Sequence, residues 1–382
     1  MMAKRVPIDT YCEKKIPTLQ KTYDGLIDYV DISSVDNTEK KIISYQTIES
    51  NDAPSRAKQL LKKGDVLVST VRPNLNAVAV VEEETENLMV GSTGYCVLRC
   101  KDNMDVRYLF NFCQSQYFVD DMSSQATGAS YPAVSNGIVR SALIPCCSIE
   151  EQREIAEKMD TVSELLALCK QQLAELDELI KSRFIELFGD PETNPKGLEK
   201  ALLSDIAEYF NGLTYSPDNV TNDGTIVLRS SNIQNSQLDF ADTVRVNSSI
   251  KDKLFVKDND ILMCSRNGSA RLVGKVALIK NLSEPMTFGA FMMIIRSRYY
   301  PYLMTYFQMD AFRRQIATGA TTTINQITGN MLNKISLPLP NMADINEFAT
   351  FVEQTDKSKL AVQQSLEKLE ILKKSLMQQY FG

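Results

Sequence analysis

The sequence has 382 residues, of which 43% are hydrophobic and 24% charged, and this balance excludes a disordered or fibrous protein. The length exceeds that of one ordinary domain and favours two or three. The formal net charge of −6 argues at first against nucleic acid as a partner, because phosphate binding depends on Lys and Arg.

The sequence predicts neither a membrane protein nor a secreted one. The longest nearly apolar runs, such as Phe288 to Ile295, are far shorter than the roughly 20 residues that cross a bilayer. The amino-terminal residues include two basic side chains but no apolar segment of the kind found in signal peptides. The eight cysteines lack paired CxxC spacing, which suggests reduced thiols. We therefore expect a cytoplasmic protein.

A repeat organises the chain, and its second copy begins about 193 residues after the first. Its motifs, in chain order, are a turn with an apolar strand at Lys63 to Ser69 and Asp258 to Ser265, Ala126-Thr127-Gly128 and Ala317-Thr318-Gly319, Ile144-Pro145 and Leu337-Pro338, Glu154-Ile155-Ala156 and Glu347-Phe348-Ala349, and Phe188-Gly189 and Phe381-Gly382. The two halves are therefore one architecture with different loops.

Each copy begins with short β-branched and aromatic runs between Gly, Pro, Asn and Ser, which predicts mixed strands with a few helices. We expect these lobes at residues 1–147 and 190–340, the second with a short linker at its start. Each copy ends in a long helix, at 148–189 and at 341–382. Most of the chain's excess acidic charge lies in 148–196, whereas 197–340 carry a slight excess of Lys and Arg.

Both helices carry a heptad pattern, in which apolar residues lie alternately three and four positions apart. These residues are Ile155, Met159, Val162, Leu166, Cys169, Leu173, Leu176, Ile180 and Leu187 in the first helix, and Phe348, Val352, Val362, Leu366, Leu369, Leu376 and Tyr380 in the second. A lobe of this size cannot cover so long a seam, so each helix should pair with the other. The expected fold class is α+β, with two pseudo-repeated mixed α/β domains joined by two long antiparallel helices, a coiled coil with pseudo-twofold symmetry.

The residue types give little support for catalysis or metal binding. The chain has no histidine, which is the commonest general base and metal ligand. Cys96 and Cys100 have no second pair nearby to complete a zinc site. Gly268 and Gly274 are separated by five residues where a phosphate-binding loop has four, and neither a GxGxxG motif nor an Asn-Pro-Pro-aromatic methyltransferase motif is present. We expect no active site, no metal and no cofactor in this chain.

The variable loops instead contain side chains suited to nucleic acid, since Arg pairs with guanine, Asn with adenine and hydroxyl groups with phosphate. The candidate DNA-binding residues are Thr70, Arg72, Asn74, Asn76, Thr127, Ser130 and Tyr131 in the first lobe, and Arg229, Ser231, Asn232, Ser265, Arg266, Asn267, Ser269, Arg271, Thr321, Thr322 and Thr323 in the second. Taken singly, each is most simply an ordinary loop residue. Their recurrence at matching places in both halves favours a function.

The order and duplication of these motifs resemble the specificity subunits of type I restriction-modification systems. The resemblance covers essentially the whole chain and includes the helix end Leu187-Phe188-Gly189-Asp190-Pro191. It departs at Asn346, where the first copy has Arg153 after Gln152. The resemblance implies a non-catalytic subunit that binds double-stranded DNA, reads one half of a split target with each lobe, and docks two methyltransferase subunits. Motor-nuclease subunits would join them, and the methyl donor, ATP and magnesium would belong to these partners.

Two other functions remain open from the sequence. A coiled-coil scaffold whose lobes bind proteins would suit the net acidity. A recognition fragment of a fused methyltransferase-nuclease is the third possibility, and the missing motifs argue against a complete enzyme.

Overall fold

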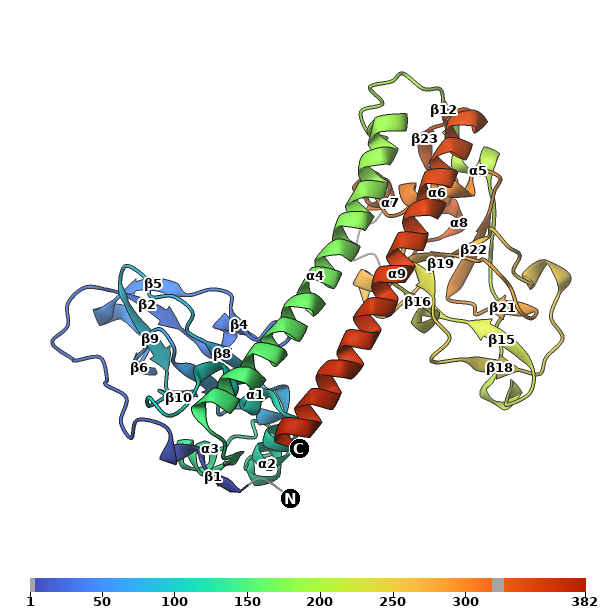
Figure 1. Cartoon of the computed structure of the whole chain (residues 1–382). Coiled ribbons are helices and arrows are strands. Elements are labelled where there is room, and N and C mark those ends of the chain that lie inside the picture. The colour runs from blue at the N-terminus through green and yellow to red at the C-terminus, as the bar shows by residue number, and fades with distance from the viewer. Residues whose placement is uncertain (1–3, 318–325) are drawn as a thin grey trace. The chain divides into compact units, whose positions relative to one another are not determined.

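The computed structural model describes residues 4–317 and 326–382 (Figure 1). The chain forms two compact units, which we call unit 1 (residues 1–171 and 363–382) and unit 2 (residues 172–362). Each of the two long helices, at 149–188 and 342–381, is divided between the two units.

In its described residues, unit 1 contains a four-stranded sheet, a three-stranded sheet and two two-stranded sheets, together with short helices. Its strands are β1 (Arg5–Pro7), β2 (Leu26–Val30), β3 (Val35–Asp36), β4 (Lys41–Ile42), β5 (Gln46–Glu49), β6 (Ala57–Leu60), β7 (Val66–Ser69), β8 (Val78–Val80), β9 (Leu88–Ser92), β10 (Tyr95–Leu98) and β11 (Leu143–Pro145). Its helices are α1 (Val106–Gln114), α2 (Gln116–Gln125), α3 (Asn136–Ser141) and the beginning of α4 (Ile149–Phe188).

Unit 2 repeats this order of elements. Its strands are β12 (Lys200–Leu202), β13 (Glu208–Asn211), β14 (Val220–Thr221), β15 (Thr225–Leu228), β16 (Ile233–Gln234), β17 (Gln237–Leu238), β18 (Val244–Val246), β19 (Ile261–Cys264), β20 (Val276–Leu278), β21 (Met286–Phe288), β22 (Met292–Arg296) and β23 (Ser336–Pro338). Its helices are α5 (Leu203–Ile206), α6 (Tyr300–Tyr306), α7 (Asp310–Ala317), α8 (Gly329–Leu332) and the beginning of α9 (Met342–Phe381).

The sheet topologies confirm the repeat predicted from the sequence. In unit 1 the strand orders are β5-β2-β9-β6 and β10-β7-β8, and in unit 2 they are β14-β18-β15-β21 and β13-β22-β19-β20. Each unit has one parallel pair, β2 with β9 and β15 with β21, in an otherwise antiparallel arrangement. In each unit an early strand pairs with the strand before the long helix, β1 with β11 and β12 with β23. The fold is therefore the α+β repeat that the sequence predicts.

The repeated turn before β7 and β19 is held by a buried ion pair. The carboxylate of Asp65 accepts two hydrogen bonds of 2.8 Å from Arg99, and the carboxylate of Asp260 accepts two, of 2.7 and 2.6 Å, from Arg296. Both aspartates are 1% exposed. One residue earlier, Gly64 and Asn259 adopt positive φ angles of 87° and 71°, which Gly and Asn tolerate best. The two copies of this motif thus share a backbone conformation and a bidentate contact.

The strands that follow these turns are covered on both faces. In β7, Val66 and Val68 contact one hydrophobic cluster while Leu67 contacts another, and in β19 Ile261 and Leu262 divide in the same way. Strands buried on both faces read as continuous apolar runs rather than as alternating ones. Both strands therefore place the loops that follow them on a rigid, buried base.

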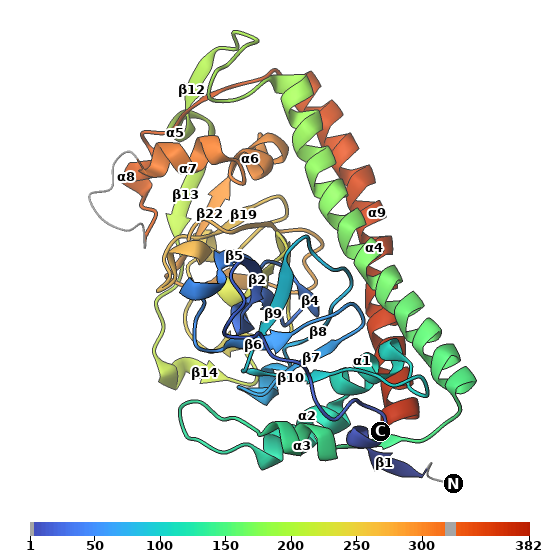
Figure 2. The same cartoon turned by 90° about the vertical axis from the view of Figure 1, so that its left-hand side faces the viewer.

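Within each unit, the segments of α4 and α9 that belong to it run side by side and antiparallel (Figures 1 and 2). In unit 2, the rings of Phe184 and Phe348 lie 5.7 Å apart, and both pack with Tyr302 of the lobe in one core. In unit 1, Ala156 near the start of α4 shares a core with Phe381 at the end of α9. The heptad prediction is confirmed, and the structure adds that the helix ends also pack into the lobes.

Polar residues fill the gaps in the heptad pattern of α9. Thr355 is buried, and the Lys359 ammonium donates to the carboxylate of Asp177 on α4 at 2.5 Å. Burial raises the pKa of the neighbouring Asp356 carboxyl. The seam is therefore apolar at its ends and polar in part of unit 2. None of the helices in the described part of the chain is long and apolar enough to cross a membrane.

Candidate nucleic-acid interface

Two loops of unit 1 lie side by side where β7 ends. The loop formed by residues 70–77 follows β7, and the loop formed by residues 126–135 connects α2 with α3. The backbone amide of Val134 donates to the carbonyl of Thr70 at 2.9 Å, and that of Arg72 donates to Pro132 at 2.7 Å. The amides and carbonyls of Thr127 and Ala133 pair with each other, which closes the second loop into a hairpin. Residues 128–132 therefore form a fixed tip beside Arg72.

Unit 2 builds the same arrangement after β19. The amide of Ile327 donates to the carbonyl of Ser265 at 2.7 Å, and the backbones of Arg266 and Gln326 form an isolated antiparallel bridge. Gln326 and Ile327, shortly before α8, thus lie beside the loop after β19, as the loop before α3 lies beside the loop after β7. Three of the candidate residues, Thr321, Thr322 and Thr323, lie outside the described residues.

Four of the predicted residues bind the protein's own backbone. The hydroxyls of Thr70 and Ser265 occupy equivalent positions and each donates at 2.9 Å, to the carbonyl of Gly94 and of Phe291 respectively. The Asn76 amide donates to the carbonyl of Cys113 at 2.8 Å. The buried Asn232 amide donates to the carbonyls of Asp239 and Asp242 at 2.8 and 2.9 Å, and its oxygen accepts from the amide of Arg229. These side chains shape the loops, and the sequence could not distinguish that role from contact with DNA.

Three further predicted residues of unit 2 are partly buried. The guanidinium of Arg229 forms an ion pair with Asp242 at 2.8 Å. The Asn267 amide donates to the hydroxyl of Ser230 at 3.2 Å, and its oxygen accepts from the amide of Ser269 at 3.0 Å. Ser231 is half-buried in the short 3-10 turn before β16. Arg229 and Asn267 therefore have partners within their own unit.

The remaining predicted residues are exposed and lie in the paired loops. In unit 1 they are Arg72, Asn74, Thr127, Ser130 and Tyr131, and in unit 2 they are Arg266, Ser269 and Arg271. The Arg72 guanidinium lies 4.8 Å from the centre of the Tyr131 ring, and that ring is 69% exposed. Both residues line a shallow cavity of about 310 Å³ together with Asn37 and Leu75. Unit 1 therefore presents a hollow edged by hydrogen-bond donors and an aromatic face.

The structure adds two residues that the sequence analysis missed. Phe291, in the turn between β21 and β22, is 59% exposed and lies under the guanidinium of Arg266 at 5.4 Å. Asn37 enters the unit 1 hollow from the turn between β3 and β4. An aromatic residue two positions after a glycine in a turn, as in Gly289-Ala290-Phe291, was the available signal for the first, and no motif marked the second.

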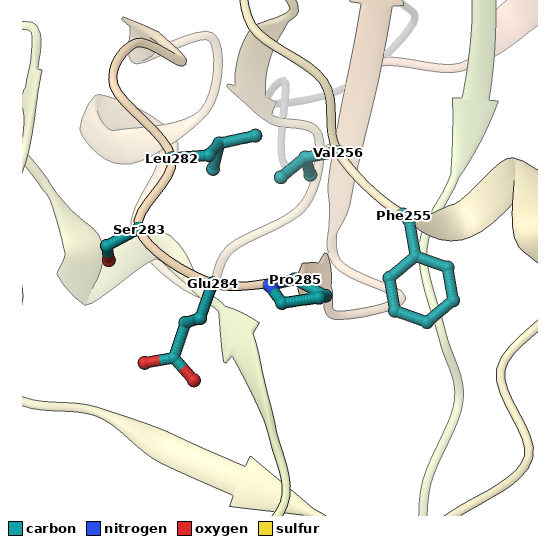
Figure 3. A pocket seen from close by; sticks show the side chains of 6 residues that line it. All are labelled: Phe255, Val256, Leu282, Ser283, Glu284 and Pro285. Carbon is teal, nitrogen blue, oxygen red and sulfur yellow. The ribbon is translucent and has the colours of Figure 1, made fainter.

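A second cavity, in unit 2, is not lined by any of the predicted residues. It has a volume of about 580 Å³ and lies between Phe255 and Val256 on one side and residues 282–285 on the other (Figure 3). The carboxylate of Glu284 is already bound by Arg245 at 2.7 Å, and this contact lowers the pKa of the Glu284 carboxyl. In the described residues, no group of three or more Cys, Asp or Glu side chains is placed to hold a metal ion.

The duplicated fold and its paired loops agree with what comparison with known proteins finds. The family model for the type I restriction modification DNA specificity domain matches residues 9–178 and again residues 195–371. The chain therefore belongs to the type I restriction-modification DNA specificity family.

Two curated relatives are specificity subunits of type I restriction enzymes. The chain is 25% identical over 281 residues to the EcoKI subunit of Escherichia coli, covering 68% of this chain and 60% of that one. It is 25% identical over 279 residues to the StySPI subunit of Salmonella potsdam, covering 65% and 58%. The match thus spans about three fifths of the length of these relatives.

Two solved structures share the fold over nearly the whole chain. A chain from a study of complex assembly and conformational transition in a type I restriction-modification system has a TM-score of 0.60 and 23% identity, with 99% of this chain and 97% of that one covered. The S subunit of a type I system from M. genitalium has a TM-score of 0.59 and 14% identity, with 99% and 96% covered.

Proposed function

We propose that this chain is the subunit that reads the DNA sequence for a type I restriction-modification complex. Each lobe would read one half of a split target in double-stranded DNA, and the paired helices would set the spacing between the halves. Two methyltransferase subunits and motor-nuclease subunits would assemble on it in the cytoplasm. They would supply the methyl donor, ATP, magnesium and all of the chemistry, so the chain itself would have no catalytic activity.

The observation that carries this proposal is the duplicated pair of loops. In both units, a loop after a fully buried strand is bonded through its backbone to the loop before a short helix, as in Val134 with Thr70 and Ile327 with Ser265. The exposed side chains at these places are Arg, Asn, Ser, Thr and Tyr, which are suited to base edges and phosphates. A rigid base under polar loops is what sequence reading requires, because base contacts demand fixed geometry.

Membership of the family supports the assignment of DNA as the partner. The curated relatives are named specificity subunits, and the family model describes a DNA specificity domain. The duplication would give two readers per chain, and two readers joined by paired helices would favour two short sites at one spacing. The duplication therefore supports the proposal of a split target.

The test is a lobe exchange read out by methylation. Methylation-sensitive sequencing of the source genome should reveal a split motif modified on both strands. Replacing residues 197–340 with the equivalent lobe of a relative should then change one half of that motif and leave the other half and the spacing intact. Replacing the lobe with its own sequence re-synthesised with different codons is the matched control. A motif that changed in both halves, or not at all, would contradict the proposal.

The alternative of a protein-binding scaffold is favoured by the net charge of −6 and by the exposed rings of Tyr131 and Phe291. The salt dependence of DNA binding distinguishes the two functions. The logarithm of the DNA association constant falls with the logarithm of the salt concentration, with a slope of about −0.9 for each phosphate that the protein neutralises. A protein-binding scaffold would show no DNA binding with such a salt dependence.

A further inference from the structure

Seven arginine side chains in the described residues lie with their guanidinium over an aromatic ring. The guanidiniums of five of them also donate hydrogen bonds to carbonyl, carboxylate or hydroxyl groups of the protein. These five are Arg5 over Tyr117, Arg107 over Phe110, Arg183 over Phe351, Arg296 over Phe210 and Arg298 over Tyr299. Their guanidiniums donate, in that order, to the carbonyls of Phe381 and Gly382, to Asp160, to Glu347, to Asp260 and to the hydroxyl of Tyr299. In these five cases the arginine is held by hydrogen bonds as well as by stacking on the ring.

The two exceptions are Arg72 and Arg266. Their guanidiniums lie 4.8 Å from the ring centre of Tyr131 and 5.4 Å from that of Phe291, and both arginines are exposed. Neither guanidinium forms an ion pair or a hydrogen bond with any other side chain or carbonyl that the structure describes. Both arginines lie in the loop directly after the central buried strand of their lobe. Each lobe thus holds one oriented arginine whose donors have no protein partner among the described residues.

The repeated backbone alone does not explain why each lobe has an arginine stacked on an aromatic ring. In unit 1 the ring comes from the loop before α3, whereas in unit 2 it comes from the turn before β22. The place that Phe291 occupies in unit 2 belongs to Gly94 in unit 1, since Ser265 bonds to the Phe291 carbonyl as Thr70 bonds to that of Gly94. The two lobes therefore reach the same side-chain arrangement with aromatic residues from different segments.

We propose that Arg72 and Arg266 each read one guanine, so that both halves of the split target contain a guanine contacted by a stacked arginine. This rests on the DNA-reading function proposed above. The edge of the guanidinium would donate two hydrogen bonds to the O6 and N7 atoms of guanine in the major groove, which is the commonest specific arginine contact. Tyr131 and Phe291 are positioning residues, which hold the plane of the guanidinium while its donors remain free.

Stacking prepares the guanidinium for an oriented contact with a base. A ring that covers one face of the guanidinium leaves its edge available, and the edge carries the fork of donors that matches the O6 and N7 atoms of guanine. It also restricts the rotation of a long side chain before DNA arrives, which reduces the entropy lost on binding. The same fork also fits phosphate oxygens, so the salt slope of the arginine variants is the measurement that separates a base contact from a phosphate contact.

The test compares guanine discrimination in the two half-targets. The full chain, assembled with its methyltransferase partners, is measured on its methylated motif and on duplexes in which each guanine is replaced in turn by 7-deazaguanine or adenine. Arg72→Ala should weaken binding to the motif by about 5- to 150-fold and abolish discrimination at one guanine of one half. Arg266→Ala should do the same at one guanine of the other half. Arg72→Lys should reduce the discrimination, because lysine keeps the charge but lacks the planar fork that fixes both hydrogen bonds.

The positioning role of the two aromatic residues is tested by the ratio of the affinities for the duplex with a given guanine and the duplex in which it is replaced. Tyr131→Phe should keep this ratio, whereas Tyr131→Ala should lower it at the same guanine that Arg72 reads. Phe291→Tyr and Phe291→Ala form the equivalent pair for Arg266. Arg56→Ala is the matched control, since it removes an exposed arginine of unit 1 that lies outside the paired loops. Unchanged circular dichroism and melting of these surface variants would show that each is folded.

Two outcomes would overturn the inference in different ways. If Arg72→Ala and Arg266→Ala weakened binding to every duplex equally and each reduced the salt slope by about one, the arginines would contact phosphates, and the DNA-reading function would stand without the guanine contacts. If the unaltered complex showed no preferred motif, the proposed function itself would fail.

Discussion

Replacing Asp260 with asparagine should destabilise unit 2 by about 3 kcal/mol, because it leaves the Arg296 guanidinium inside the lobe without its counter-charge. The carboxylate accepts two parallel bonds of 2.7 and 2.6 Å from that arginine. Hydrogen bonds to charged groups contribute about 1.5 to 3 kcal/mol each, which sets an upper range of about 3 to 6 kcal/mol. Arg296 is 26% exposed, so water can recover part of this loss, and the lower end applies.

The assay is native-state hydrogen exchange, because the two units need not unfold in one transition. Amides of β19 and β22 should lose protection in Asp260→Asn, while those of β7 and β10 should not. Asp258→Asn is the matched control: it makes the same change two residues earlier, at an exposed carboxylate that accepts only a 3.4 Å bond from Leu282. We expect a change below about 0.5 kcal/mol there. Equal effects of the two substitutions would refute the reasoning.

Three further predictions concern the helices and the pH dependence of stability. Leu173→Asp in unit 2 and Leu366→Asp in unit 1 should each lower the melting temperature and impair complex assembly, because an unpaired charge would enter the apolar seam. Phe348→Ala should cost about 3 to 5 kcal/mol of unfolding free energy in denaturant titration, since it empties a fully buried ring site. Burial and the charge of Lys373 lower the pKa of Lys40 to about 8, so the unfolded chain binds more protons between that pH and its ordinary pKa of 10.5. The contribution of Lys40 to stability should therefore rise across this pH window, so the stability of the unaltered chain relative to Lys40→Met should increase between urea titrations at pH 7.5 and at pH 10.

Controls separate these effects from general damage. Gln172→Asp adds the same charge on the exposed side of α4 and should leave melting unchanged. If Leu173→Asp behaved like Gln172→Asp, the paired-helix seam would be wrong. For the pH prediction, a stability difference between the two proteins that is the same at both pH values would contradict it. If Phe348→Ala lowered the unfolding free energy by less than about 1 kcal/mol, the neighbouring side chains of the unit 2 core would have moved to fill the cavity, contrary to the prediction.

The sequence predicts the repeat and the helix seam because both leave periodic signals. The buried strands β7 and β19 read as apolar runs after a turn, and the heptads of α4 and α9 read as stripes. The polar members of the α9 seam interrupt that stripe, so Thr355 and Lys359 were not predicted to lie in it. The partner of Lys359 is Asp177, 182 residues away, and no local pattern shows such a contact.

The sequence located the candidate loops but could not sort the residues within them. Thr70 and Arg72 are two positions apart, yet one hydroxyl is buried against the carbonyl of Gly94 and the other side chain is exposed. The direction of a loop side chain depends on neighbours that are distant in sequence. The same holds for Arg99, which binds Asp65 across 34 positions and explains why the aspartate recurs in both motifs.

The division of the helices between the units sets an order for folding during synthesis. Unit 2 is one continuous stretch of chain, whereas unit 1 needs residues 363–382, including the Phe381 ring that packs on Tyr108 and Phe112. Roughly 190 residues separate its two parts, which a ribosome adds in about 10 to 40 seconds. The lobe that is synthesised first is therefore the last to be completed, and its exposed core is the part of the nascent chain that chaperones would need to shield.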